Sequence, residues 1–389
     1  MKRILLVFST IIMLLSLTGA QPAAEIVIGI NLPLTDNTGL SPVGRETKNA
    51  AEMILARIKV QGGLEIRGRR YPLRFVYVDN EMNVERAPVA ARRLVEGEKV
   101  LAVIGPLGSR RAIPAGEFCN ANKTPMISPW STDPATTKGR PYVFRACFVD
   151  PFQAPAAARF TREKFNAVKT AILYSPEDNY SKTLAELYRD SWNTNYGEVA
   201  AWESCGQSDS DFSAQLSRII SSGAEVLYLP VYYDIAARIV PQAKSLGWDK
   251  PVMGADAWGS ADLWNLSEGS VAGYYFTTHY TAAGAVGKTR EFIDAYRAIY
   301  GYVPGDVAAL TRDAIDIVLQ GIQNAGLTGN LARDRNALRN ALAETAGFEG
   351  VTGKISRFDR EGDPVKEVLV IKINSGGQFV YETAVQPGR

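Results

Sequence analysis

Nearly continuous apolar runs alternate with amphipathic helical stretches along most of this chain, and this alternation constrains the fold more than any other feature. Apolar runs without polar alternation are typical of parallel strands that helices cover on both faces. Six such runs are Glu25–Asn31, Leu73–Asp79, Val100–Pro106, Thr170–Pro176, Glu225–Val231 and Pro251–Asp256. Apolar residues keep helical spacing from Ala50 to Ile58, ahead of the stop signal Gly62-Gly63, and again within Thr311–Asn324. The strand–helix–strand repetition predicts an α/β fold with parallel sheets.

Turn-rich clusters follow most of these runs, and they are rich in hydroxyl and aromatic side chains but poor in lysine. The clusters are Pro33–Gly39, Gly105–Ser109, Ser128–Thr132 and Ser175–Tyr180. Open α/β sheets bind ligands at the carboxyl ends of their strands, so these clusters are candidate binding loops for a small polar molecule. No GxxxxGK[ST] or GxGxxG motif follows a strand, which argues against a nucleotide.

The charge balance argues against a nucleic-acid partner. The chain has 389 residues, with 43 Lys and Arg against 41 Asp and Glu. Such a chain lacks the general attraction to phosphate backbones that nucleic-acid-binding proteins show. Its length favours two or three domains.

Few residues suit catalysis or metal binding. His279 is the single histidine, and neither a G-x-S-x-G elbow nor an HExxH motif occurs. We therefore expect no catalytic residues, no metal site and no cofactor, although composition alone leaves open a glycosidase with a carboxylate pair. For Cys119, Cys147 and Cys205 we expect at most one disulfide and mostly buried free thiols.

The first twenty residues have the layout of a secretory signal peptide. Lys2 and Arg3 precede an apolar run from Ile4 to Leu17, and small residues follow up to Ala20. The run is shorter than the roughly 20 residues of a membrane span. Position 21 is Gln, whereas a bacterial lipoprotein has Cys after the small residues. We expect cleavage of residues 1–20 and a soluble periplasmic protein with 41 bases against 41 acids, since Lys2 and Arg3 are removed.

An ordered series of segments carries a family resemblance. The segments are IGINLPLTDNTG (28–39), QGG (61–63), YVDNEMNVERAPVAARRLV (77–95), VIGPLGS (103–109), PMISPWSTDPATT (125–137), PYVFRACFVD (141–150), DFSAQLSRI (211–219) and GFEGVTGKISRFDREGDP (347–364). Over essentially the whole mature length, the chain resembles the leucine/isoleucine/valine-binding type of ABC-transporter solute-binding proteins.

The resemblance implies a type I periplasmic-binding fold with two α/β lobes, each a mostly parallel sheet flanked by helices, which close on ligand about three hinge crossings. The crossings would fall near Arg145–Cys147, Thr277–Tyr280 and Gly353–Ser356. Lobe one would then comprise residues 25–146 with 279–353, and lobe two residues 147–278 with 354–389.

The family binds an amino acid's carboxylate with hydroxyl and backbone N–H groups of lobe one. By this resemblance Ser109 and Thr132 would supply the hydroxyls, and Trp130 and Ser131 would lie at ligand-contacting positions between them. Ordinary turn chemistry or helix capping is the alternative for Ser109 and Thr132. Trp130 replaces a small residue, and its indole would either fill the cleft, requiring a small or flat ligand, or point outward as lobe packing.

Three residues of lobe two match family positions that face the ligand. Asp256 would pair with the ligand's ammonium group, and its alternative role is the N-cap of a helix at 261–266. Tyr180 and Tyr232 match aromatic ligand contacts, with core or hinge packing as the alternative. His279 is a minor candidate.

The resemblance therefore implies an extracytoplasmic binding protein that captures a small amino acid, or a related carboxylate or amide, and delivers it to an inner-membrane ABC permease. The expected partners are this small molecule and the permease, and the protein itself is expected to be a monomer. The alternative is a periplasmic ligand-sensing module that acts through a separate signalling partner.

Overall fold

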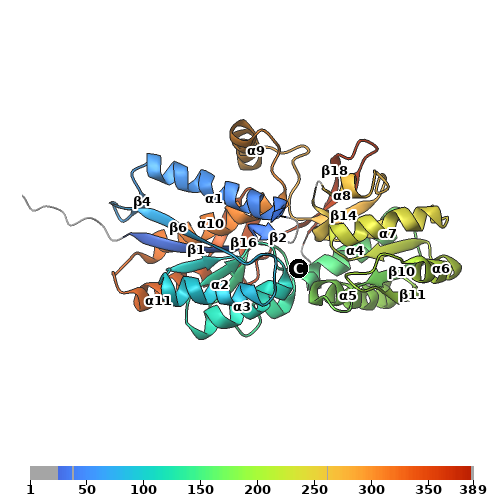
Figure 1. Ribbon diagram of the computed structural model, residues 1–389, viewed down its shortest axis with the longest axis horizontal. Helices are drawn as coiled ribbons and strands as arrows, with labels where there is room; N and C mark the ends of the chain where they lie inside the picture. Colours follow the sequence, from blue (N-terminus) through green and yellow to red (C-terminus); the bar gives the residue numbers. More distant parts are fainter. Residues whose placement is uncertain (1–24, 37–38, 261, 387–389) are drawn as a thin grey trace, which may run out of the picture.

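The computed structural model describes residues 25–36, 39–260 and 262–386, which form two α/β lobes side by side (Figure 1). The predicted signal peptide lies outside the described residues. Among the described residues, no helix combines the length and the apolar character that crossing a membrane requires.

The first lobe is built on a five-stranded parallel sheet in the order β6-β1-β7-β8-β9. Its strands are β1 (Ile26–Leu32), β6 (Leu73–Asp79), β7 (Ala102–Ile104), β8 (Met126–Ser128) and β9 (Val143–Arg145). Its helices are α1 (Pro42–Val60), α2 (Arg86–Arg92, continued by a π-helical turn Arg93–Gly97), α3 (Ser109–Ala121), α9 (Gly287–Tyr300), α10 (Asp306–Ala325) and α11 (Leu331–Ala343). Small antiparallel hairpins join β2 (Thr35–Asp36) to β3 (Gly39–Leu40), β4 (Leu64–Ile66) to β5 (Arg69–Tyr71), and β15 (Ala346–Gly350) to β16 (Gly353–Arg357).

The second lobe has a seven-stranded sheet in the order β11-β10-β12-β13-β14-β17-β18. Its strands are β10 (Lys169–Tyr174), β11 (Glu198–Ser204), β12 (Val226–Leu229), β13 (Val252–Gly254), β14 (Tyr275–Thr278), β17 (Val368–Ile373) and β18 (Phe379–Val385). Its helices are α4 (Asp150–Phe165), α5 (Asn179–Asn195), α6 (Ser213–Ser221), α7 (Tyr233–Ser245) and α8 (Asp262–Leu266). The strands up to β14 are parallel, whereas β17 and β18 are each antiparallel to the strand before them in the sheet.

Helices cover both faces of each sheet, which explains the continuous apolar runs. Along β12, Val226 and Tyr228 pack in the cluster formed with α4 and α5, whereas Leu227 and Leu229 pack against α6 and α7. Since successive side chains of a strand point to opposite faces, both sets must be apolar when both faces are covered. All six predicted strands and both predicted helices are confirmed in type, with ends shifted by a few residues at most positions.

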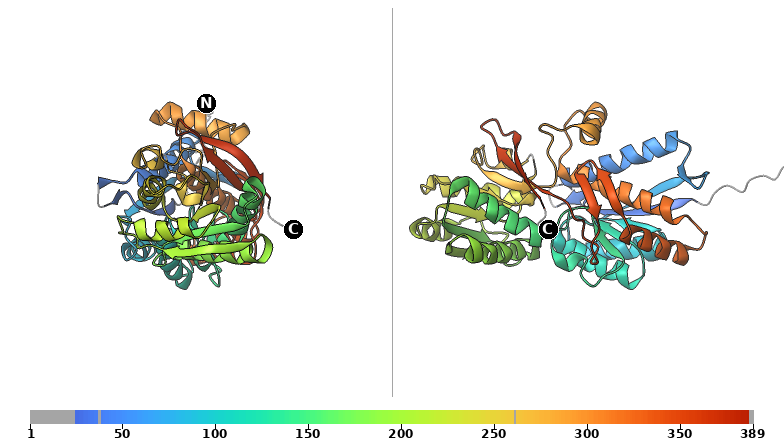
Figure 2. Two further views of the ribbon diagram at one scale, coloured as in Figure 1. Left: turned by 90° about the vertical axis from the view of Figure 1, so that its right-hand side faces the viewer. Right: turned by 180° about the vertical axis from the view of Figure 1, so that it is seen from behind.

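The third predicted crossing between the lobes is wrong. Ile355 and Phe358 pack in the core of the first lobe together with β1 and α10, so the hairpin β15–β16 stays with that lobe. Seen from behind, the hairpin lies with α10 and α11, and β17–β18 lie in the other lobe (Figure 2). The chain therefore crosses between Phe358 and Val368, about ten residues later than expected. Sequence pattern could not place this point, because a strand looks the same in either lobe. The other lobe boundaries stay a prediction.

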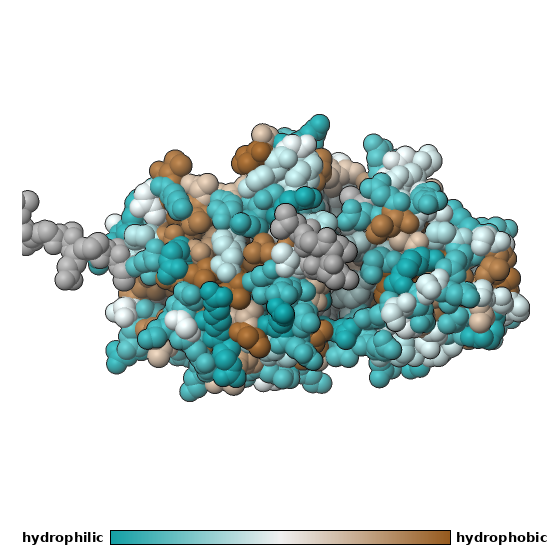
Figure 3. Space-filling view, viewed as in Figure 1, coloured by the Kyte–Doolittle hydropathy of each residue, from teal (hydrophilic) through white to brown (hydrophobic). Residues whose placement is uncertain are grey.

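The visible surface is mostly hydrophilic (Figure 3) and the three cysteines are buried, as is usual in a folded protein. The face in Figure 3 is mostly hydrophilic over both lobes, with apolar side chains scattered singly or in small groups. Cys119, Cys147 and Cys205 are all buried free thiols, as predicted, and none of them forms a disulfide.

Candidate functional site

The turns at the carboxyl ends of strands from both lobes meet in the inter-lobe site. The loops after β7 and β8 come from the first lobe, and the turns after β10, β12 and β13 come from the second. This is the place where open α/β sheets bind ligands. The seven predicted ligand-binding residues lie on these loops or at the starts of the helices that follow them: Trp130, Ser131, Thr132 and Tyr232 on loops, and Ser109, Tyr180 and Asp256 in the first turns of helices.

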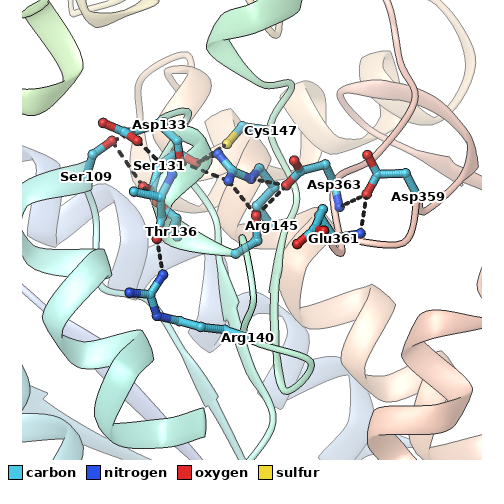
Figure 4. A network of polar contacts seen from close by, with 12 residues as sticks. Ser109, Ser131, Asp133, Thr136, Arg140, Arg145, Cys147, Asp359, Glu361 and Asp363 are labelled. Atoms are coloured by element: carbon cyan, nitrogen blue, oxygen red, sulfur yellow. Dashed lines mark hydrogen bonds and ion pairs between the residues drawn. The ribbon is translucent and has the colours of Figure 1, made fainter. Parts of the chain in front are cut away.

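Hydroxyl groups gather at the N-terminus of α3, where the helix begins with Ser109. The Ser109 Oγ accepts hydrogen bonds from the Ser131 hydroxyl at 3.1 Å and from the Asp133 backbone N–H at 3.3 Å (Figure 4). The Ser131 Oγ also lies 2.6 Å from the Thr136 Oγ1. The N-terminus of a helix presents free N–H groups and a positive partial charge, which favour an anion.

Two buried donors beside this turn make no well-aligned hydrogen bond among the described residues. One is the Nε1 of Trp130, whose side chain is 9% exposed, and the other is the hydroxyl of Thr132, which lies beside the Asp150 carboxylate. Buried polar groups in folded proteins are normally hydrogen-bonded. These donors are therefore available to an anionic group of a ligand.

A buried arginine fixes the loop that carries these groups. The Arg145 guanidinium donates to the Ser131 carbonyl at 2.7 Å and to the Asp133 carbonyl at 2.9 Å. Its Nε lies 2.6 Å from the Asp363 carboxylate, and its Nη2 donates to the Thr137 hydroxyl at 2.8 Å (Figure 4). A planar guanidinium holds several acceptors in one fixed geometry. Arg145 therefore supports the anion side of the site without being free to contact a ligand.

The acidic side of the site is centred on Asp256, which is 2% exposed. Its Oδ1 accepts from the Gln153 amide at 2.7 Å and from the Tyr180 hydroxyl at 2.8 Å, and its Oδ2 lies 3.2 Å from the His279 Nε2. The Tyr180 hydroxyl in turn accepts from the Ala257 N–H at 3.1 Å. These contacts hold Asp256 in place and exclude the alternative that it caps the helix at 261–266.

A second carboxylate lies next to it and makes no well-aligned hydrogen bond among the described residues. Asp150, the first residue of α4, is fully buried, and the Thr132 hydroxyl lies beside its carboxylate. Burial and then the charge of Asp256 raise the pKa of Asp150 well above its usual range, and the neighbouring Thr132 hydroxyl lowers it in part. The Oε1 of Gln153 is also buried without a partner. Acceptors without a well-aligned partner among the described residues are therefore gathered beside Asp256.

The neighbouring histidine is neutral. Burial lowers the pKa of His279 to about 4, although the hydrogen bond to Asp256 opposes this shift. Its ring stacks on Phe148 with centroids 3.6 Å apart, and its Nδ1 has no hydrogen-bond partner. His279 thus acts in this site as a structural hydrogen-bonding group beside Asp256.

Trp130 fills the space between the lobes instead of pointing outward. Its indole makes an edge contact with Tyr232 of the second lobe, with ring centroids 6.3 Å apart, and Tyr232 also packs on Tyr180 at 5.3 Å. A Cβ at Gly108 of the first lobe would lie 3.1 Å from the Tyr232 hydroxyl. Of the two predicted orientations, the structure has the one in which the indole occupies the cleft.

Polar contacts also join the lobes at the rim of the site. Arg110 of α3 donates to the Gln207 side chain of the second lobe at 2.6 Å, and the Thr183 hydroxyl of α5 lies 3.3 Å from the Asp133 carboxylate. The lobes are thus closed against each other along this boundary.

The architecture agrees with that of known proteins. Residues 25–378 match the periplasmic binding protein family. The chain belongs to this family. A crystal structure of the leucine-binding protein LivK of Thermotoga maritima has a TM-score of 0.84 and 30% sequence identity, covering 93% of this chain and 99% of that one.

Two further comparisons agree. The branched-chain amino acid transporter substrate-binding protein LivJ of Streptococcus pneumoniae, in complex with isoleucine, has a TM-score of 0.82 and 30% identity, covering 93% of this chain and all of that one. The Leu/Ile/Val-binding protein BraC3 of Rhizobium johnstonii is 27% identical, over 92% of this chain and 94% of its own length. The predicted family and two-lobe fold are confirmed, and this is a family of extracytoplasmic binding proteins, not of enzymes.

Three groups of the site are not marked as ligand contacts by the sequence pattern or the resemblance. Asp150 and Gln153 were missed, although Asp150 ends the segment PYVFRACFVD that carried the resemblance, and His279 was only a minor candidate. A buried Asp at the first position of a helix after a strand that ends in Arg is a weak signal, because acids at helix N-termini are common for electrostatic reasons alone. Within the residues that the structure describes, no cluster of three or more His, Cys, Asp or Glu side chains is placed to hold a metal ion.

Proposed function

We propose that this protein captures an amino acid between its lobes, in an extracytoplasmic compartment, and delivers it to an ABC permease. The observation that carries the proposal is that one lobe offers groups that favour an anion and the other lobe offers groups that favour a cation. The first lobe offers the α3 N-terminus and the buried donors of Thr132 and Trp130, which suit a carboxylate. The second lobe offers the carboxylates of Asp150 and Asp256, which suit an ammonium group.

The zwitterionic backbone of an amino acid matches both sides at once. Neutral donors stabilise a carboxylate through convergent hydrogen bonds and do not require a buried cation. A ligand that contacts both lobes favours the closed state, because its affinity for the closed state exceeds its affinity for the open one. Names of relatives that specify leucine, isoleucine and valine support the amino-acid class.

In this proposal the carboxylate of the ligand is bound by Ser109, Trp130, Ser131 and Thr132. The ammonium group is bound by Tyr180, Tyr232, Asp256 and Asp150. The protein carries out no reaction on its ligand, binds no nucleic acid, and acts as a monomer in the periplasm after removal of residues 1–20. Light scattering checks the monomer. The mass of exported protein checks the cleavage, which should leave Gln21 first.

A thermal-shift screen tests the proposed binding. A ligand that binds only the folded state raises the melting temperature with its concentration. At least one α-amino acid should do so when amino acids, amides and aromatic acids are compared, and the amino acid should be recovered unchanged. A response to aromatic acids alone, or turnover of the ligand, would contradict the proposal.

A further inference from the structure

A third carboxylate lies at the boundary between the lobes, on the first lobe, and one of its oxygens has no hydrogen-bond partner among the described residues. Asp306 is the first residue of α10 and is 4% exposed, and its Oδ2 is buried without a hydrogen bond. Glu46 of α1 lies beside it and accepts a hydrogen bond from the Gly305 N–H at 3.1 Å. Burial raises the pKa of Glu46 to about 7, and the hydrogen bond from Gly305 and then the charge of Arg45 oppose this shift in part.

Asp306 faces the turn of the second lobe that follows Asp256 in the sequence. A Cβ at Gly259 would lie 2.7 Å from the Asp306 Oδ2, so the carboxylate lies against the backbone of the turn that begins at Asp256. Burial, and then the charges of Asp256 and Glu46, raise the pKa of Asp306 well above its usual range.

A tyrosine hydroxyl next to these acids is also unsatisfied. Tyr280, two residues after the end of β14, is 7% exposed, and its Oη is buried without a hydrogen bond among the described residues. Tyr280 packs in one cluster with Ala308 of α10 and Ala50 of α1, the helices that carry Asp306 and Glu46, and burial with the charges of these two acids raises its pKa. Buried polar groups of proteins are normally hydrogen-bonded, so two such groups without a protein partner point to a polar group of a ligand as their partner.

We propose that Asp306, Glu46 and Tyr280 form the subsite for the ligand's side chain, and that the ligand is an amino acid whose side chain carries a cationic nitrogen. This inference rests on the function proposed above and specifies its ligand class. An aliphatic side chain would leave the Asp306 oxygen buried and unpaired, which is unfavourable. A cationic nitrogen would satisfy Asp306 and Tyr280 and would relieve the repulsion between Asp306 and Asp256 across the lobes.

Calorimetric titration of the wild-type protein with lysine, arginine, leucine and alanine tests the inference. Lysine or arginine should bind at least about tenfold more tightly than leucine, because a buried charge partner discriminates strongly against a ligand that lacks the charge. Asp306→Asn should weaken binding of that cationic amino acid by about tenfold and change alanine affinity by less than about twofold, since alanine does not reach the subsite.

Asp316→Asn is the matched control, because it removes the same charge from α10 about 15 Å further along the helix. It should leave all four affinities unchanged. If Asp306→Asn does not fold, as judged by circular dichroism, Tyr280→Phe takes its place and should selectively weaken the cationic amino acid.

Three results would overturn the inference, and they differ in what they say about the proposed function. Tighter binding of leucine than of lysine and arginine would leave amino-acid capture intact and reject the cationic subsite. Equal losses for the cationic amino acid and alanine in Asp306→Asn would reject Asp306 as a side-chain contact. No binding of any amino acid would reject the proposed function and this inference with it.

Discussion

The two walls of the inter-lobe site differ both in chemistry and in how their groups are held. The first-lobe wall around Ser109 and Thr132 consists of neutral donors on a loop that Arg145 fixes from behind. The second-lobe wall holds two carboxylates, of which Asp256 is hydrogen-bonded by three side chains, whereas Asp150 makes no well-aligned hydrogen bond among the described residues.

This difference indicates what each wall contributes to binding. The donor wall is preorganised, because Ser109, Ser131 and the Asp133 N–H are hydrogen-bonded to one another before any ligand binds. The acidic wall contains a buried carboxylate whose pKa is raised, so the closed state without ligand is penalised there. A ligand's ammonium group removes this penalty, and the second lobe should therefore control how strongly ligand favours closure.

The largest effect is expected for Asp256→Ala. The substitution removes the carboxylate that would pair with the ligand's ammonium group and leaves the Tyr180 hydroxyl buried without an acceptor, so amino-acid affinity should fall by about 3 kcal/mol, roughly a hundredfold. Calorimetry measures this loss. Asp249→Ala, an exposed acid of the same lobe, is the control and should bind normally. Unchanged affinity in Asp256→Ala would show that the ligand lacks an ammonium group at this position.

Asp150→Asn should come next, with a loss of about 2 kcal/mol in amino-acid affinity, because it removes the unpaired charge beside Asp256. The same substitution should stabilise the ligand-free protein. An Asp whose pKa is raised by folding is destabilising when charged, so its penalty is absent near the ordinary Asp pKa of about 4 and grows as pH rises toward the raised value.

Thermal melts of ligand-free wild type and Asp150→Asn check this sign. The variant should melt at a higher temperature at about pH 7 to 8, and the difference should vanish near about pH 4. A variant that is less stable at neutral pH would mean that Asp150 has a stabilising partner in the folded state.

On the donor wall, Thr132→Val should weaken amino-acid binding by about 1.5 kcal/mol, roughly tenfold, since it replaces a hydroxyl that donates to a carboxylate with a methyl group of the same shape. The melting temperature of the free protein should change little, because the hydroxyl makes no well-aligned hydrogen bond and only lies beside the Asp150 carboxylate. If Thr132→Val kept the wild-type preference for the amino acid over its carboxamide, the hydroxyl would not contact the carboxylate.

The smallest effect is expected for Trp130→Phe. The ring contact with Tyr232 is retained and only the Nε1 donor and part of the indole are lost, so affinity should fall by about 0.5 to 1 kcal/mol. Titration with the preferred amino acid and with a larger homologue measures this change. The larger homologue should gain relative affinity, and an equal loss for both would indicate that the indole does not limit ligand size.

How far the sequence predicts this molecule depends on how local each feature is. The strands around Ser109, Thr132 and Asp256 follow from apolar runs and turn clusters, which are local, and the family resemblance located the residues on them. Asp150, Gln153 and Asp306 lie in segments separated along the chain, and only the fold brings them to the same site. The orientation of Trp130 depended on Tyr232 in the other lobe, and the third crossing on where Ile355 and Phe358 are buried, so neither could be predicted from a local pattern.

The central claim is that one ligand satisfies the donor wall with its carboxylate and the acidic wall with its ammonium group. The most direct test is calorimetric titration with the tightest-binding amino acid, its carboxamide and its deaminated acid. Both derivatives should bind at least about a hundredfold more weakly than the amino acid, because each leaves one wall with buried groups unpaired. Equal binding of the deaminated acid would contradict the role of Asp150 and Asp256, and equal binding of the carboxamide would contradict the role of Ser109 and Thr132.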